Sequence, residues 1–278
     1  MHTSVMTHTT PGDIATNSSL KLNSEARQFL EADGKYIPID KDFTISIWFK
    51  ADSLPGAHGE IISQGRSSGP GFFIGYNADK KIRIGDSWQT SQVDFPSDNN
   101  WHNIQVTRQG TNCKLFIDGN LKDQTDNFQI SGEGSNLRIG NQFGSPGPHP
   151  NEHWNGLIDE VKIYEEALTE SELSAIRNNT PTNEKAIFSA SFEKGLFAQD
   201  EKTGNSIELT AHGSGGSLPQ IVQQVYHRGN SLYTIVDGIQ WNAAQENSVK
   251  LGGNLATINS HNENTFVVTE FAQLAVSA

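Results

Sequence analysis

The stretch FTISIWFK, residues 43–50, alternates between apolar and mostly polar side chains. Every second position is apolar: Phe43, Ile45, Ile47 and Phe49. The positions between them hold Thr44, Ser46, Trp48 and Lys50. Because successive side chains of a β-strand point to opposite faces, this pattern predicts a strand with one face buried in the core and the other exposed to solvent.

Similar short segments, separated by turn residues, continue to about residue 164. They read EIISQG, GFFIGYN, KIRIG, HNIQVTR, CKLFID and NLRIG. Asp118-Gly119 predicts a hairpin, since a tight primed turn requires positive φ values. The spacing of these segments, without helical periodicity between them, predicts a mainly β, antiparallel, two-sheet sandwich.

The strand expected at LIDEVKIY, residues 157–164, carries a carboxylate on its apolar face. Alternation places Asp159 on the same side as Leu157, Val161 and Ile163. An unpaired ionised carboxylate in a core costs several kcal/mol or more, so Asp159 would need a partner there. The alternative is a β-bulge that shifts the alternation and lets Asp159 face solvent or cap a turn.

A short helix is expected directly after that strand, in EEALTESELSAIRNN. Thr169 and Glu172 have the spacing of a capping box, and Leu173 and Ile176 give the helix one apolar edge. Along the whole chain we expect four parts: a flexible tail (1–17), a sandwich domain (18–213), a linker (214–224) and a short α+β segment (225–278).

The composition excludes several classes of function. The 278 residues include 32 acidic and 20 basic side chains, a formal net charge of −12. Binding to nucleic acid or to an anionic membrane requires a basic face, so neither is expected as a partner.

The single cysteine, Cys113, allows no intrachain disulfide. No run of about 18 apolar residues predicts a membrane span, and residues 1–13 do not read as a signal peptide.

Three longer motifs, in order, resemble the laminin-G-like (concanavalin A-like) jelly-roll family. They are FTISIWFKADS, WHNIQVTRQGTNCKLFIDGN and WNGLIDEVKIYEEALTESEL, spread over about 150 residues. Residues 225–278, from YHRGNSLYTIVDG to NSHNENTF, are similar to the first half of a C-type lectin-like domain of the disulfide-free bacterial sort. The first resemblance implies a jelly-roll sandwich, and the second a truncated partner domain.

The first strand of that family has no counterpart before residue 18. A similar segment, FSASFEKGLFAQDEKTGN, follows the expected helix instead. Since the first and last strands of such sandwiches are neighbours, we hypothesise that residues 186–213 pair beside residues 157–164 in a permuted order. The alternative is that they begin a second, truncated copy, which would leave the first sandwich with a bare edge.

The family resemblance also implies a structural calcium ion where the first strand, its following loop and the last strand meet. Carried over to this chain, the ligands would be Asp159, Glu193, Asp200 and Asn205, since Ca²⁺ takes oxygen ligands. Such an ion would make the buried charge of Asp159 tolerable and would tie the late segment to the sandwich.

Sugar binding through the C-type lectin-like part is not expected, because the EPN or QPD triplet and the WND motif of that family are absent. Trp241 and Phe266 are expected in its core. In the sandwich, Trp48 and Trp101 lie within strand patterns and are expected to pack. Trp88 and Trp154 are the candidate ligand contacts, since an exposed tryptophan can stack on a sugar face.

The sequence does not support either of two catalytic patterns. HPNEH, residues 149–153, matches the HxxEH string of inverted zinc proteases, but Pro146, Pro148 and Pro150 predict a surface loop rather than the helix this chemistry requires. The ExDxxE string of glucanases with this topology is not found on an expected strand. The chain is therefore not expected to be an enzyme.

These observations predict a non-catalytic, extracellular or cell-surface module with structural calcium. Its partners would be glycans or matrix and cell-surface components, and the combination of domains resembles large secreted bacterial adhesins. The alternatives are a ligand-free spacer, as a fragment of a larger adhesin, and a sandwich-fold glycoside hydrolase.

Overall fold

A computed structural model describes residues 18–223 with short gaps at 67–68, 86–87, 89–91, 131, 133, 145–146, 179, 181 and 194. It also describes residues 226–228, 231–233, 241–250, 261 and 265. The expected tail, the side chains of Trp241 and Phe266 and most of residues 225–278 lie outside the described residues.

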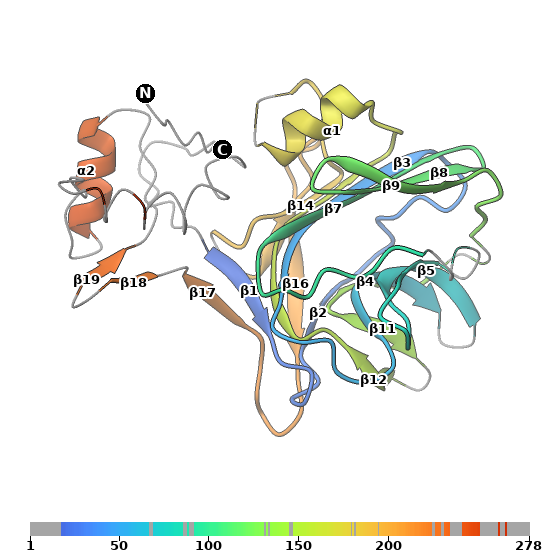
Figure 1. The fold of residues 1–278 in the computed structure, drawn as a ribbon, viewed down its shortest axis with the longest axis horizontal. Coiled ribbons are helices and arrows are strands. Elements are labelled where there is room, and N and C mark those ends of the chain that lie inside the picture. Colours follow the sequence, from blue (N-terminus) through green and yellow to red (C-terminus); the bar gives the residue numbers. More distant parts are fainter. Residues whose placement is uncertain are drawn as a thin grey trace.

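The described chain is mainly β, as the alternating segments predict (Figure 1). The strands before the helix are β1 (Ser18–Leu22), β2 (Phe29–Ala32), β3 (Phe43–Ala51), β4 (Gly59–Arg66), β5 (Gly69–Tyr76), β6 (Ile82–Ile84), β7 (His102–Gln109), β8 (Asn112–Ile117), β9 (Asn120–Thr125), β10 (Leu137–Ile139), β11 (Asn141–Gly144), β12 (Gly147–His153) and β13 (Gly156–Tyr164). After them come α1 (Glu170–Arg177), β14 (Phe188–Ala190), β15 (Phe197–Gln199), β16 (Ser206–His212), β17 (Gln220–Gln223), β18 (Tyr226–Arg228), β19 (Ser231–Tyr233) and α2 (Trp241–Lys250). Neither helix is long and apolar enough to cross a membrane, within the described residues.

The strands form an antiparallel sandwich. The path of hydrogen-bonded neighbours runs β6-β5-β4-β10-β2-β16-β15-β14-β13-β3-β7-β8-β9, and β1 pairs with both β13 and β17. We call the part from β13 to β9, with β1 and β14, the first sheet, and the part from β16 to β6 the second sheet. Every pairing between described strands is antiparallel, which confirms the predicted sandwich.

Side chains of the two sheets meet in one apolar core. The ring of Phe43 on β3 lies edge-on to that of Phe72 on β5, 5.2 Å away, which is a favourable aromatic geometry. All four apolar residues of FTISIWFK are fully buried in this core. The side chains between them point away from it, and Trp48 and Lys50 are partly exposed. We call this side of β13, β3, β7 and β8 the outer face of the first sheet.

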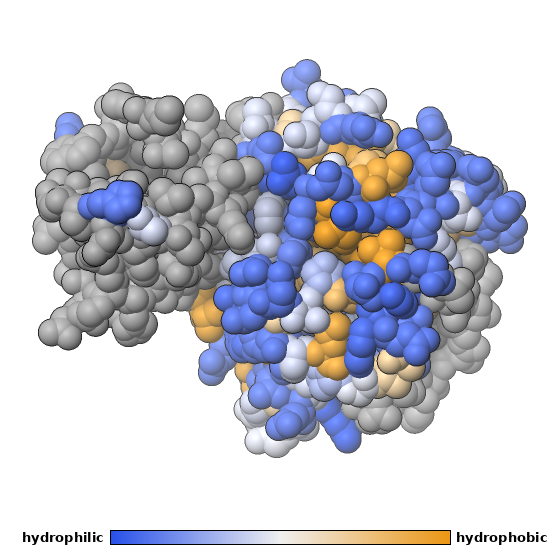
Figure 2. Space-filling view, in the orientation of Figure 1, coloured by the Kyte–Doolittle hydropathy of each residue, from blue (hydrophilic) through white to orange (hydrophobic). Residues whose placement is uncertain are grey.

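Helix α1 covers one end of this outer face. Its Leu173 and Ile176 pack with Phe116 and Tyr164 in a small second cluster. The helix begins at the predicted capping box: Thr169 Oγ1 accepts the Glu172 N–H at 3.4 Å, and the Glu172 carboxylate accepts the Thr169 N–H at 2.7 Å. The visible surface of the sandwich is mainly hydrophilic, with hydrophobic residues in several separate patches (Figure 2).

The late segment lies in the sandwich, beside the strand 157–164. β14 pairs with residues 161–163 of β13, and β16 pairs with all four residues of β2. Phe188, Ala190, Phe192, Ala198 and Leu209 are buried in the same core as β3. β1 pairs with residues 156–158 of β13 on the same side as β14, so the two strands divide one edge of β13 between them.

A β-bulge in β13 separates these two stretches of pairing. The register against β3 shifts between Asp159 and Lys162, and Glu160 has a φ of 46°, in the left-handed region. Ile158, Val161 and Ile163 therefore share the core face. The expectation that Leu157 and Asp159 face the core is wrong, because the extra residue turns them to the outer face, opposite Lys50 and Trp48. Asp159 is nevertheless only 8% exposed, so it does not face solvent either.

Candidate functional site

Four side chains form a row across the outer face of the first sheet. Asp159 on β13 lies directly opposite Trp48 on β3, and Trp48 lies directly opposite Asn103 on β7. Asp118, immediately after β8, continues the row, because its Oδ1 accepts the Asn103 N–H at 2.8 Å. Cross-strand partners on one face have Cβ atoms roughly 5 Å apart, so these groups are neighbours. We call them the outer-face row.

Trp48 is the aromatic member of this row. It is partly exposed and belongs to neither apolar cluster, so it is not the packing residue that its strand position predicts. The sequence does carry a signal for this exposure, because Trp48 stands at one of the polar, outward-facing positions of FTISIWFK. An indole combines a large apolar face with one N–H donor, which suits it to contact both C–H and hydroxyl groups.

Asn103 is fully buried beside Trp48, and its amide is only partly satisfied. Its Nδ2 donates to Ser46 Oγ at 3.3 Å and to the Ile47 carbonyl at 3.2 Å. Its Oδ1 has no hydrogen-bond partner among the described residues. Gln105, the next residue on this face of β7, donates to the Leu173 carbonyl at 2.9 Å and so fixes α1 next to the row.

Asp159 lies at the other end of the row. On β13 it falls between the residues that pair with β1 and those that pair with β14. Burial and the nearby carboxylates of Glu160 and Glu193 raise the pKa of Asp159 well above its ordinary value. Asp159 Oδ1 accepts the Glu160 N–H at 2.8 Å, and Glu160 forms an ion pair with Lys162 at 2.7 Å. Glu193 Oε1 accepts the Ser18 N–H at 2.9 Å, which links the beginning of β1 to the segment after β14.

The structure brings together two of the four predicted calcium ligands. Asp159 and Glu193 interact through their charges. Asp200 instead organises its own turn: its Oδ1 accepts the N–H groups of Lys202 at 2.9 Å and Thr203 at 3.2 Å. Asn205 is exposed at the end of the same turn. No group of three or more His, Cys, Asp or Glu side chains within the described part of the chain is placed to hold a metal ion, so Asp200 does not join the other two carboxylates.

Both predicted ligand tryptophans are core residues. Trp154 is fully buried, edge-on to Phe49 at 5.7 Å and tilted against Phe95 at 5.6 Å. Trp88 is also buried, with its ring 6.5 Å from that of Phe128. The expectation that they offer an exposed face is therefore wrong, since both rings fill space between the sheets. The HPNEH segment lies in β12, a strand rather than the expected loop.

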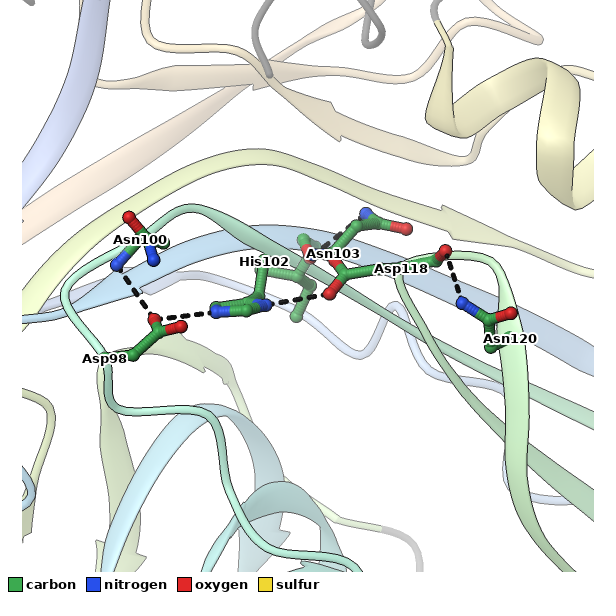
Figure 3. A network of polar contacts seen from close by, with 7 residues as sticks. Asp98, Asn100, His102, Asn103, Asp118 and Asn120 are labelled. Carbon is green, nitrogen blue, oxygen red and sulfur yellow. Dashed lines mark hydrogen bonds and ion pairs between the residues drawn. The ribbon is translucent and has the colours of Figure 1, made fainter. Parts of the chain in front are cut away.

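His102, next to Asn103 on β7 and opposite Phe49 on β3, lies between the carboxylates of Asp98 and Asp118 (Figure 3). Its Nδ1 is 2.8 Å from Asp118 Oδ2, and its Nε2 is 2.9 Å from Asp98 Oδ1. Asp98 Oδ1 also accepts the Asn100 N–H at 3.0 Å. These contacts hold the loop before β7 against the β8–β9 turn.

Comparison with known proteins identifies the fold. Residues 23–174, more than half of the chain, match the model of the concanavalin A-like lectin/glucanases superfamily. No curated protein matches the chain. The first half of a C-type lectin-like domain, expected at residues 225–278, finds no support in these matches.

Two solved structures share the fold at low sequence identity. A candidate carbohydrate binding protein from Bacteroides ovatus is 12% identical with a TM-score of 0.57, over 81% of this chain and 62% of its own. The extracellular region of zebrafish Gpr126/Adgrg6 is 14% identical with a TM-score of 0.51, over 76% of this chain and 27% of its own. This chain thus spans less than two thirds of either protein. By its sequence match and its sandwich, the chain belongs to the concanavalin A-like lectin/glucanases superfamily.

Proposed function

We propose that this chain is a non-catalytic carbohydrate-binding module of an extracellular or cell-surface protein, and that the outer-face row holds the sugar. The observation that carries the proposal is the partly exposed Trp48, in one row with the Asp118 carboxylate, whose side chain is 41% exposed. Sugars present C–H faces to an aromatic ring and hydroxyl groups to such polar neighbours. The lectins of the superfamily and the Bacteroides ovatus protein support the ligand class by analogy.

The spacing of the carboxylates in the row supports binding rather than hydrolysis. Asp159 and Asp118 are separated by three strand spacings, roughly 14 Å. Glycoside hydrolases place their two carboxyl groups about 5 to 9.5 Å apart. Asp118 is in addition engaged by His102 and by the Asn103 N–H.

A glycan-array screen of the whole chain tests this proposal. We expect binding to a defined set of oligosaccharides, with no release of reducing sugar when those ligands are incubated with the protein. An array without any hits would favour the ligand-free spacer and would contradict the proposed function. Release of sugar would favour the glycoside hydrolase.

We propose in addition that a calcium ion supports the junction between β1, β13 and β14, with Asp159 and Glu193 among its ligands. Two carboxylates held close together are unfavourable without a cation, and Ca²⁺ prefers carboxylate oxygens. Asp200 and Asn205 remain predicted ligands. The Asp200 side chain and the Asn205 backbone make hydrogen bonds within their own turn, so their position adds no support to the calcium proposal.

Thermal melts with calcium and with chelator test the calcium proposal. We expect calcium to raise the melting temperature of the wild-type chain and to leave Asp159→Asn unchanged, because the variant keeps the shape of the side chain but removes one charge. Each 1 kcal/mol of stabilisation corresponds to about 2–4 °C for a domain of this size. Asp79→Asn, at an exposed carboxylate in the turn before β6, is the control and should respond to calcium as the wild type does. Equal melting temperatures of the wild type in calcium and chelator would contradict the proposal.

A further inference from the structure

The position of His102 specifies its protonation state. Both ring nitrogens face a carboxylate oxygen, Asp118 Oδ2 at 2.8 Å and Asp98 Oδ1 at 2.9 Å (Figure 3). A neutral imidazole has a single N–H, so one of its nitrogens would direct a lone pair at a carboxylate. Only the imidazolium ion can donate to both oxygens, and such charge-assisted hydrogen bonds are stronger than neutral ones.

This arrangement reaches the outer-face row through Asp118. While Oδ2 of Asp118 faces the His102 ring, its Oδ1 accepts the Asn103 N–H at 2.8 Å. The Asp118 N–H in turn donates to the Asn103 carbonyl at 2.9 Å. Asp118 has a φ of 52°, a left-handed conformation that its surroundings must hold in place. The same carboxylate therefore links the His102 ring to the backbone of Asn103, the neighbour of Trp48.

We propose that His102 is a positioning residue of the sugar site and that its protonation holds the Asp118 end of the outer-face row, so that glycan affinity falls as pH rises. This inference rests on the proposed function. Loss of the proton leaves one carboxylate without its donor, which loosens either the Asp98 loop or the Asp118 turn. The Asp118 carboxylate, whose side chain is 41% exposed, then loses the fixed orientation in which it can meet a sugar hydroxyl.

The pH range follows from the groups that face the ring. These are the Asp98 and Asp118 carboxylates and the uncharged ring of Phe49, whose centroid is 6.0 Å away. Burial lowers the pKa of His102, but the hydrogen bonds and charges of Asp118 and Asp98 outweigh it and raise the pKa above its ordinary value of about 6.5. Asp98, despite some burial, has its pKa lowered to about 2 and stays ionised. Because the folded-state pKa of His102 is raised, its contribution is complete below about pH 6.5 and is lost as pH rises through the raised value.

The test measures glycan affinity by calorimetry from about pH 5.5 to 9, using an oligosaccharide found on the array. Wild-type affinity should fall by about tenfold or more over this range, the lower end of what one charge-assisted hydrogen bond contributes. His102→Asn should bind weakly at every pH, and His102→Arg, which stays charged, should bind without pH dependence. Asp98→Asn removes one carboxylate from the ring, so its profile should shift to lower pH.

Imidazole NMR signals of the same samples separate the possible outcomes. The His102 signal, assigned among nine histidines by its absence in His102→Asn, should titrate above pH 6.5 in wild type and lower in Asp98→Asn. If glycan binds but its affinity does not follow the His102 titration, the inference is overturned and the sugar site stands. If no glycan binds at any pH, the proposed function fails and the inference with it.

Discussion

Phe188→Ala should lower the free energy of unfolding by about 3–5 kcal/mol, the cost of deleting a large buried aromatic side chain. Phe188 is fully buried on β14, with its ring 5.1 Å from that of Tyr36. It lies outside residues 23–174, the part that matches the superfamily. A loss of this size would show that the late segment completes the core of the sandwich and does not merely follow it.

Urea denaturation followed by tryptophan fluorescence measures this effect, and Leu121→Ala supplies a control. Leu121 lies on β9 and is 46% exposed, so its truncation should change stability by no more than about 0.5 kcal/mol. A Phe188→Ala variant with stability within 1 kcal/mol of wild type, by the cavity scale above, would mean that the sandwich holds together without β14.

Trp48→Ala should weaken glycan binding by roughly 30-fold or more, about 2 kcal/mol, as expected for a tryptophan at the centre of a binding surface. The fold should tolerate the change, because Trp48 is partly exposed and outside the apolar clusters. Trp48→Phe keeps an aromatic face and should recover part of the affinity.

Calorimetry on the same oligosaccharide, together with circular dichroism of each variant, measures this effect. Leu121→Ala is again the matched control, since it removes an exposed apolar side chain from the same sheet and should bind as the wild type does. Full affinity in a correctly folded Trp48→Ala would place the sugar site elsewhere.

Local signals made much of the fold predictable. The alternation in FTISIWFK defines the buried and outer sides of β3, and Thr169 with Glu172 begins α1 at the expected residue. Both features depend on residues a few positions apart, where backbone geometry alone determines which side chains meet. The family resemblance of the segment FSASFEKG predicts that residues 186–213 lie beside residues 157–164, and β14 pairs with β13 there.

The candidate site was harder to predict, because it depends on long-range register. A single extra residue at Glu160 moves Asp159 from the core face to the outer face, and no residue in LIDEVKIY marks the bulge. The row then combines residues from three strands and from the turn after β8. Trp88 and Trp154 are buried against aromatic rings distant in sequence, such as Phe128 and Phe49, which their local sequence does not show.

The most direct test of the central claim is the response of the tryptophan indole N–H signals in an NMR titration with the glycan. The chain has five tryptophans, and the Trp48 signal is identified by its absence in Trp48→Phe. We predict that the Trp48 signal shifts on binding, while the signals of the buried Trp88 and Trp154 stay in place. A saturating titration that leaves the Trp48 signal unmoved would contradict the account.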